Sequence, residues 1–590
     1  MYSPSQVIVL VTPVFFALMA LEWAVARRRG LRAYQQSDAI SSLNLGMLSQ
    51  TSAVFVKLLT LGIYTMAVGQ VALVHNDAFW FSLPGWLLAL LFYDFCYYWL
   101  HRMGHQVAVL WAAHAVHHQS QDYNLSTALR QTSSGPLLAW IFYLPMALAG
   151  VPPLVFAVVG LIDLLYQFWV HTEQVGRLGW FDRWFCAPSN HRVHHAINDR
   201  YVDKNYGGIL IVWDRLFGTF QPEEDSEPCV YGTRGLLNSW DPLWANATIY
   251  RQLLHDSWHA QRLGDKLRVW LKPPGWRPAD VAQRFPKPAF DLEAHRQRFD
   301  PPLSRAMAGF AWLQFAALVA GVAAFLWQAD QAPQAQNLLW FGVLLTGQWA
   351  LGAAMQGRIS PWMALLLQSA ALATATAALG LREWHWLFKP LALAIALVYV
   401  ASYADRTLIS QSKHGKKQKA WFLGALFFSL LGDISLMLDG LFIPGLVFFL
   451  LAHLCYVACF RCDAPWLAHR GALIGIGLLA CMVYTLLCLG GLPAALRLPV
   501  LAYVAVIAVM AAQAWGRFSV QRSQPAWLVA LGSSFFMASD TLLAFDRFVQ
   551  PLPWAIVGVL STYFVAQALI VQGCVAGLGL GLKQASHIPD

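Results

Sequence analysis

Nine of the eighteen histidines in the chain fall between residues 101 and 195. Within the clusters they are spaced three or four residues apart, which puts imidazoles on one face of a helix. Imidazole suits iron and leaves it redox-active, and two neighbouring irons need about eight ligand positions. The pattern therefore predicts a centre of two iron ions that uses O2, rather than a single zinc site. The predicted ligands are His101, His105, His114, His117, His118, His171, His191, His194 and His195.

A further histidine pair, His255 and His259, has the same four-residue spacing but lies far along the chain from the other clusters. One such pair arises often by chance, because any helix can carry two histidines a turn apart. We therefore expect this pair to lie away from the metals.

The composition is that of a membrane protein. The chain is 58% hydrophobic and only 12% charged, whereas soluble domains carry about 25% charged residues. The net charge of +9 does not indicate a nucleic-acid partner, because most Lys and Arg residues lie in loops between apolar runs, where they set orientation. The nine cysteines are scattered, several of them inside apolar runs, and predict neither disulfides nor zinc. We expect a membrane lipid as the partner.

Apolar runs near the spanning length of about 20 residues recur along the chain. They predict an all-α polytopic membrane protein with about fifteen transmembrane helices in two membrane domains. A polar stretch separates the two sets of runs at residues 173–305. The runs lie at 6–26, 42–68, 80–100, 136–150, 152–170, 306–327, 337–356, 360–380, 386–403, 420–438, 442–460, 470–489, 497–514, 525–545 and 553–579.

Basic residues indicate how the chain crosses the membrane. Arg27, Arg28, Arg29 and Arg32 follow the first run, and basic loops stay in the cytoplasm. Alternation from this point places residues 101–135 and 173–305 on the same side. We therefore expect an integral protein, in the bacterial cytoplasmic (inner) membrane, whose histidine-rich di-iron region faces the cytoplasm.

The three histidine boxes resemble the fatty acid hydroxylase/sterol desaturase superfamily of membrane di-iron enzymes. The sequence around the third box is more similar to one branch, the alkylglycerol monooxygenase family. It reads PSNHRVHHAIN at 188–198, YVDKNYGG at 201–208 and WDRLFGTF at 213–220. The resemblance implies a domain over residues 1–355, with the nine histidines as iron ligands. It also implies hydroxylation of the carbon beside an ether oxygen, with electrons from tetrahydropterin or another, unknown donor.

The polar residues after the third box have two readings. Asn198, Asp203, Lys204, Asn205 and Tyr206 could orient the imidazoles or bind a lipid headgroup. They could equally form a capped turn at the membrane surface.

Ionisable residues recur inside the apolar runs of the second half. They are Lys389, Asp433, His453 and Asp540. Such residues are costly in lipid and are functional candidates for that reason. Two neighbouring carboxylates can supply an acid and a base from one residue type. The alternative is a structural ion pair of Lys389 with one aspartate.

The same residues carry a second resemblance, to the lysoplasmalogenase (YhhN-type) family. The matching segments are FKP at 388–390, LGD at 431–433, AHLCY at 452–456, SD at 539–540 and YFVAQ at 563–567. The resemblance implies an eight-helix membrane domain over residues 356–590 that hydrolyses the vinyl ether of lysoplasmalogens. Asp433 and Asp540 then act as acid and base in an undetermined order, with Lys389 and His453 as orienting groups.

Two other functions stay open at this point. The di-iron centre could act on a sterol, a hopanoid or a fatty acyl chain, as a hydroxylase or desaturase. The chain could also be a transporter or lipid-binding protein, since intramembrane charges suit proton-coupled transport. The sequence contains no internal repeat relating its halves, which disfavours a transporter.

Overall fold

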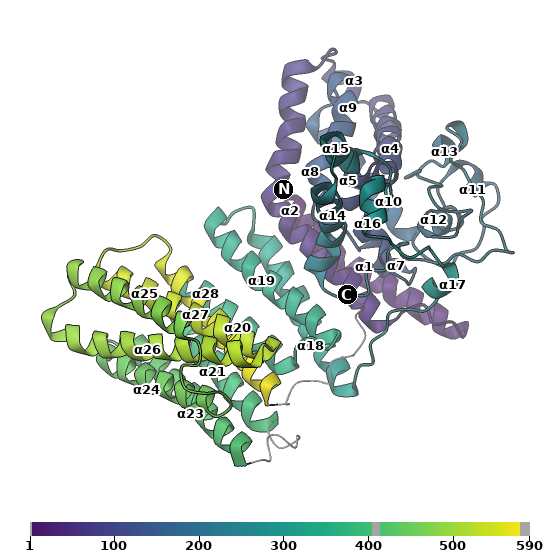
Figure 1. The fold of residues 1–590 in the computed structure, drawn as a ribbon. Helices are drawn as coiled ribbons and strands as arrows, with labels where there is room; N and C mark the ends of the chain where they lie inside the picture. Colours follow the sequence, from purple (N-terminus) through teal and green to yellow (C-terminus); the bar gives the residue numbers. More distant parts are fainter. Residues whose placement is uncertain (1–2, 404–412, 579–590) are drawn as a thin grey trace. The chain divides into compact units, whose positions relative to one another are not determined.

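The computed structural model describes residues 3–403 and 413–578, and these residues form an all-helical protein. The chain divides into two compact units, Met1–Asn337 and Leu338–Asp590 (Figure 1). Each unit is described separately below.

The first unit consists of six long helices and many short ones. The long helices are α1 (Pro4–Arg28), α2 (Gln36–Val71), α4 (Leu83–Gln106), α10 (Pro153–Trp169), α14 (Pro242–His259) and α18 (Arg305–Gln328). The short ones are α3 (Asp77–Trp80), α5 (Ala108–Ala112), α6 (Ala115–His118), α7 (Leu125–Ala128), α8 (Gly135–Ala139), α9 (Leu144–Leu148), α11 (Phe181–Trp184), α12 (Pro188–His195), α13 (Val212–Leu216), α15 (Leu263–Leu271), α16 (Ala279–Arg284) and α17 (Leu292–His295).

An apolar core fixes α4, the helix that carries the first histidine box. Ala89 and Cys96 of α4 are buried against Tyr64 of α2 and Met146 of α9. The ring of Tyr93 stacks on Tyr143, with centroids 4.6 Å apart. This packing holds the apolar part of α4, so its last turn presents the box at a fixed place.

The second unit is a bundle of long helices. Consecutive helices pack most closely, notably α27 on α28, α23 on α24 and α20 on α21. Its described helices are α19 (Gln334–Met355), α20 (Pro361–Ala378), α21 (Arg382–Tyr403), α23 (Lys413–Met437), α24 (Phe442–Arg461), α25 (Arg470–Leu489), α26 (Ala494–Gln521), α27 (Gln524–Phe548) and α28 (Ala555–Gly577). From α20 onward the described residues therefore contain eight helices.

The expected count of about fifteen spans is not confirmed. Among the described residues, ten helices are long and apolar enough to cross a membrane, or up to eleven if a bent pair in α2 counts as one span. The runs at 136–150 and 152–170 are shorter apolar helices, Gly135–Leu148 and Pro153–Trp169. A helix of 17 residues is about 25 Å long, which is less than the roughly 30 Å of a hydrocarbon core. These two runs are therefore not among the candidate spans.

Candidate metal centre and a buried charged cavity

Four segments of the first unit bring the nine predicted ligands together. The last turn of α4 carries His101 and His105, and α6 follows His114 directly. His171 lies two residues beyond the end of α10. Pro188 at the first position and the Asn190 side chain, which accepts from the Ala187 amide at 3.1 Å, start α12 and so set the third box. Eight of the nine histidines are buried, and His114 is half-buried.

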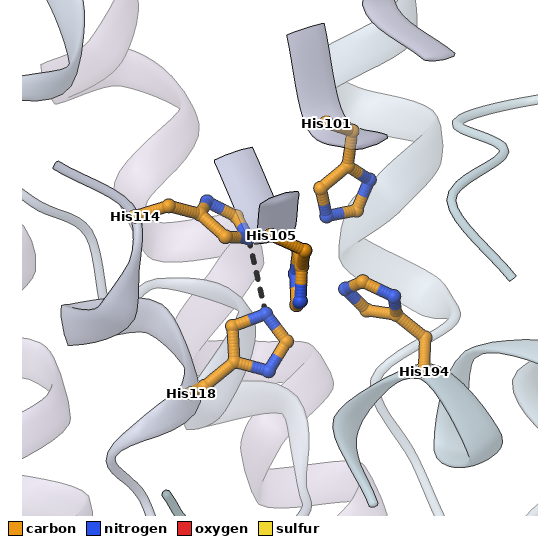
Figure 2. A group of neighbouring side chains, drawn as sticks. All are labelled: His101, His105, His114, His118 and His194. Carbon is orange, nitrogen blue, oxygen red and sulfur yellow. Dashed lines mark hydrogen bonds between the residues drawn. The ribbon is translucent and has the colours of Figure 1, made fainter. Parts of the chain in front are cut away.

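The nine histidines separate into two groups, each able to hold a metal ion. Within each group the candidate ligand atoms all lie within 4.8 Å of one another. Adjacent residues on α6 and α12 point to different groups, because neighbours on a helix diverge by about 100°. Each of these short helices thus serves both groups. The first group is His101, His105, His114, His118 and His194 (Figure 2), and the second is His117, His171, His191 and His195.

Backbone carbonyls select the tautomer of four of these rings. A carbonyl only accepts hydrogen bonds, so the ring nitrogen beside it carries the proton and the other nitrogen keeps its lone pair. Metal-bound histidines are commonly oriented in this way. The Nδ1 atoms donate from His101 to Tyr206 O (2.9 Å), His117 to Arg130 O (3.0 Å), His171 to Gln167 O (2.7 Å) and His194 to Lys204 O (3.0 Å).

The remaining ring nitrogens face one another. The Nε2 atoms of His171 and His117 are 3.2 Å apart, and those of His171 and His191 are 3.1 Å apart. Two nitrogens bound to one ion at about 2.1 Å lie about 3 Å apart, so this spacing suits a shared cation. Burial lowers the pKa of His117 to about 4, which keeps the ring neutral and able to bind.

Four further Nε2 atoms are buried without any hydrogen-bond partner in the described structure. They belong to His101, His105, His194 and His195. Buried polar atoms are normally paired, and these four are directed into the two groups. The donor set and its unpaired atoms therefore fit two metal ions.

The polar segment after the third box is mainly a structural turn that works through its backbone. Lys204 and Tyr206 orient His194 and His101 by their carbonyls rather than their side chains. Asn205 adopts a left-handed conformation (φ 57°), and its side-chain amide donates to Asn190 O at 3.0 Å. Asp203 is the exception, because its Oδ1 lies 3.5 Å from His105 Nδ1.

Two buried aspartates hold this segment against α4. Asp214 accepts hydrogen bonds from the amides of Tyr206 and Gly207, both at 2.7 Å. Asp94 of α4 accepts from the Ile209 amide at 2.7 Å and from Trp213 Nε1 at 2.8 Å. The sequence prediction missed both residues. Asp94 could have been found, since it is a charge within an apolar run, the signal used for the second half.

His255 and His259 belong to neither group. Both lie on α14, where His255 Nδ1 is 3.1 Å from Asp256 Oδ1 and both rings pack on Phe285.

In the second unit, Lys389 and Asp433 form an ion pair. The sequence analysis gave such a pair as one of two interpretations of these residues. Lys389 Nζ lies 3.3 Å from Asp433 Oδ1, and both side chains are buried. The hydroxyl of Tyr563 donates to Asp433 Oδ2 at 2.6 Å.

The second aspartate, Asp540, has different partners. Its Oδ2 accepts a hydrogen bond from the Tyr503 hydroxyl at 2.5 Å. His453 lies behind them, with Nε2 3.0 Å from the Tyr503 oxygen and 3.7 Å from Asp540 Oδ2. The sequence prediction missed Tyr503, which no charge marks within its apolar run.

Both aspartates line one cavity with about 1070 Å³ of empty space, open mouth included. Lys389 also lines it, whereas His453 does not. Its other walls are largely apolar, with residues such as Leu487 of α25 and Val504 of α26. The cavity thus offers two carboxylates beside room for an apolar chain.

Comparisons with known proteins agree with both halves of this picture. The chain is 37% identical to alkylglycerol monooxygenase of Homo sapiens over 310 residues, covering 52% of the chain and 68% of that protein. It is 39% identical to alkylglycerol monooxygenase of Danio rerio over 314 residues, covering 52% and 67%. The chain belongs to the alkylglycerol monooxygenase family. This member of the alkylglycerol monooxygenase family matches the fatty acid hydroxylase family model at residues 86–219, which include all nine histidines.

This alkylglycerol monooxygenase family member carries a second domain. Residues 384–574 match the YhhN family model and include Lys389, Asp433, His453 and Asp540. The chain is also 37% identical to lysoplasmalogenase TMEM86B of Homo sapiens over 147 residues, covering 25% of the chain and 60% of that protein. No solved structure matches the chain. Both resemblances seen in the sequence are confirmed.

Proposed function

We propose that this chain is an integral membrane enzyme with two ether-lipid activities. The first unit is an iron-dependent oxygenase that acts on an alkyl ether lipid, in keeping with its alkylglycerol monooxygenase relatives. The second hydrolyses the vinyl ether of a lysoplasmalogen, in keeping with its lysoplasmalogenase relative. The observation that carries the oxygenase is the convergence of nine histidines in two groups with inward-facing nitrogens.

The two groups are proposed to hold two iron ions, one each. Iron bound there would supply the activation of O2 for insertion of one oxygen atom beside the ether oxygen. The protein's part is to keep the rings neutral, fix their tautomers through backbone carbonyls and exclude water by burial. Hydroxylation consumes O2, two electrons and two protons and releases water. The resulting hemiacetal breaks its carbon–oxygen bond to give an aldehyde and an alcohol, and tetrahydropterin is the proposed electron donor.

In the cavity of the second unit, Asp433 and Asp540 have separate proposed roles. Asp433 is the proposed general base for water, with the ammonium group of Lys389 3.3 Å from its Oδ1 to orient it. Asp540, held by Tyr503 beside His453, is the proposed general acid. Proton transfer to the vinyl carbon creates an oxocarbenium-like cation, and water adds to it. The hemiacetal then releases an aldehyde and the glycerol-bearing alcohol.

We place the protein in the bacterial cytoplasmic membrane, with the histidine groups on the cytoplasmic side. The support is the distribution of basic residues, such as Arg27 to Arg29 after α1 and Lys416, Lys417 and Lys419 in α23. A membrane lipid is the proposed partner, and nothing in the charge distribution favours nucleic acid.

Purified full-length protein with a reductant tests the oxygenase. It should convert an alkylglycerol to a fatty aldehyde under O2, with one atom of labelled oxygen in the aldehyde before exchange, and should contain about two irons. Oxidation of sterols or free fatty acids but not of glyceryl ethers would contradict the ether-lipid assignment. One zinc and no iron would contradict the oxygenase altogether.

A further inference from the structure

The cavity of the second unit has a cation at its edge that no proposed chemical step uses. Arg547 of α27 lines the cavity and is exposed. Its guanidinium lies 3.8 Å from the ring centroid of Phe442. Within the described part of the chain, no carboxylate pairs with it, whereas Arg382 at the start of α21 lies 3.7 Å from Asp439. An unpaired guanidinium beside a lipid-sized cavity is available to an anionic ligand.

Arg547 lies on the same helix face as the proposed acid. Among the α27 residues that line the cavity, Met537, Asp540, Ala544 and Arg547 follow one another at intervals of three or four positions. This is one face of a helix. Arg547 lies seven positions after Asp540, which corresponds to about 10 Å along the helix axis.

That separation matches a glycerophospholipid with a vinyl ether. Seven bonds join the vinyl carbon that takes the proton to the phosphorus atom, and an extended chain of this length spans about 9 Å at about 1.3 Å per bond. A phosphate at Arg547 therefore puts the vinyl carbon beside Asp540. The tail then meets the apolar walls of α25 and α26, at residues such as Ala480 and Ile507, which also line the cavity.

We propose that Arg547 binds the phosphate of the lipid substrate and selects phosphorylated over unphosphorylated vinyl ethers. Guanidinium suits this task because it presents two parallel donors to phosphate oxygens. The proposal rests on the hydrolase function proposed above. We assign the ligand as the phosphate of a lipid rather than free phosphate. Only a lipid has an apolar chain that can pack against the apolar walls of the cavity.

The test compares two substrates on the full-length protein without a reductant, so that the oxygenase stays idle. Arg547→Gln should raise KM for a 1-alkenyl-glycerophosphoethanolamine roughly 10- to 100-fold, the usual range for losing a charged hydrogen bond. Its kcat and its activity on 1-alkenylglycerol should not change. Arg547→Lys should lie between wild type and Arg547→Gln. The matched control is Arg497→Gln, an exposed arginine of α26 that does not line the cavity, and it should behave as wild type.

A binding experiment separates this proposal from the hydrolase function. Saturated 1-alkyl-glycerophosphoethanolamine and 1-alkylglycerol cannot be hydrolysed, and their affinities are measured for wild type and both variants. Selective loss for the phosphorylated lipid in Arg547→Gln supports the proposal even if wild type cleaves no vinyl ether. Equal loss for both lipids, or loss for neither, overturns it. Displacement by inorganic phosphate as effective as by the lipid overturns the assignment to a lipid.

Discussion

His117 and His171 point their Nε2 atoms at each other across 3.2 Å, while each ring donates its Nδ1 proton to a backbone carbonyl. Two lone pairs at this distance repel unless a cation lies between them. Without a cation the two Nε2 atoms make no favourable contact with each other. When a metal ion binds, both nitrogens can bind it. Since a preformed site couples metal affinity to folding, the bound ions should stabilise the first unit.

The neighbours His194 and His195 allow the two metal groups to be emptied separately, because they belong to different groups. Replacing either by Ala should reduce iron from about two to about one per chain and abolish ether oxidation. Replacing His118 should act like replacing His194, since both belong to one group. Metal analysis with activity assays checks this. His259→Ala is the control and should keep both irons; loss of iron there would show that α14 contributes a ligand.

Metal-depleted protein should lose stability as the pH falls from about 6.5 to about 4. The folded-state pKa of His117 is about 4 because burial penalises the charged ring, whereas the unfolded value is about 6.5. Between these values the unfolded chain binds more protons, so the free energy of unfolding decreases with falling pH. Thermal unfolding across this range checks it. His117→Gln should give a shallower dependence than wild type, and an equal slope would contradict the assignment.

Asp214→Asn should weaken iron binding without removing a ligand. The carboxylate accepts the Tyr206 and Gly207 amides and so positions the carbonyl that orients His101. An amide nitrogen in place of one oxygen would face a donor. Groups that orient metal ligands are typically worth 10- to 100-fold in affinity, which iron titration against a chelator measures. Asp225→Asn, at a side chain 94% exposed, should leave the affinity unchanged. If Asp214→Asn binds iron as tightly as Asp225→Asn does, Asp214 does not contribute to the metal centre.

The two activities should be separable within the intact chain. Asp433→Asn and Asp540→Asn should each lower vinyl ether hydrolysis by roughly 10²- to 10⁴-fold, the usual contribution of general acid–base groups. Both variants should retain iron and ether oxidation, whereas His194→Ala should show the reverse. Asp439→Asn, fully exposed on the loop after α23, is the matched control. If each aspartate variant loses only about two-fold in hydrolysis, both aspartates have a structural role. Inhibition of hydrolysis by a chelator would indicate a metal in the cavity.

The residue types of both sites were predictable from the sequence, but their grouping was not. Spacing within each box predicted shared helix faces, yet which ring joins which group depends on how α6 and α12 meet. Lys389 and the two aspartates were marked by their charge in apolar runs, whereas Tyr503 carries no such mark. The number of spans was the least predictable feature, since an apolar helix such as α10 can be too short to cross.

The distribution of the metal groups along the chain also has a consequence for biosynthesis. Each group takes its first ligand from before residue 118 and its last from α12, at His194 or His195. Neither group is complete until α12 has left the ribosome. The carbonyl that orients His194 follows later still, at Lys204. Iron therefore has to be loaded after the first four long helices have been synthesised, and a chain truncated before this point carries only part of each site.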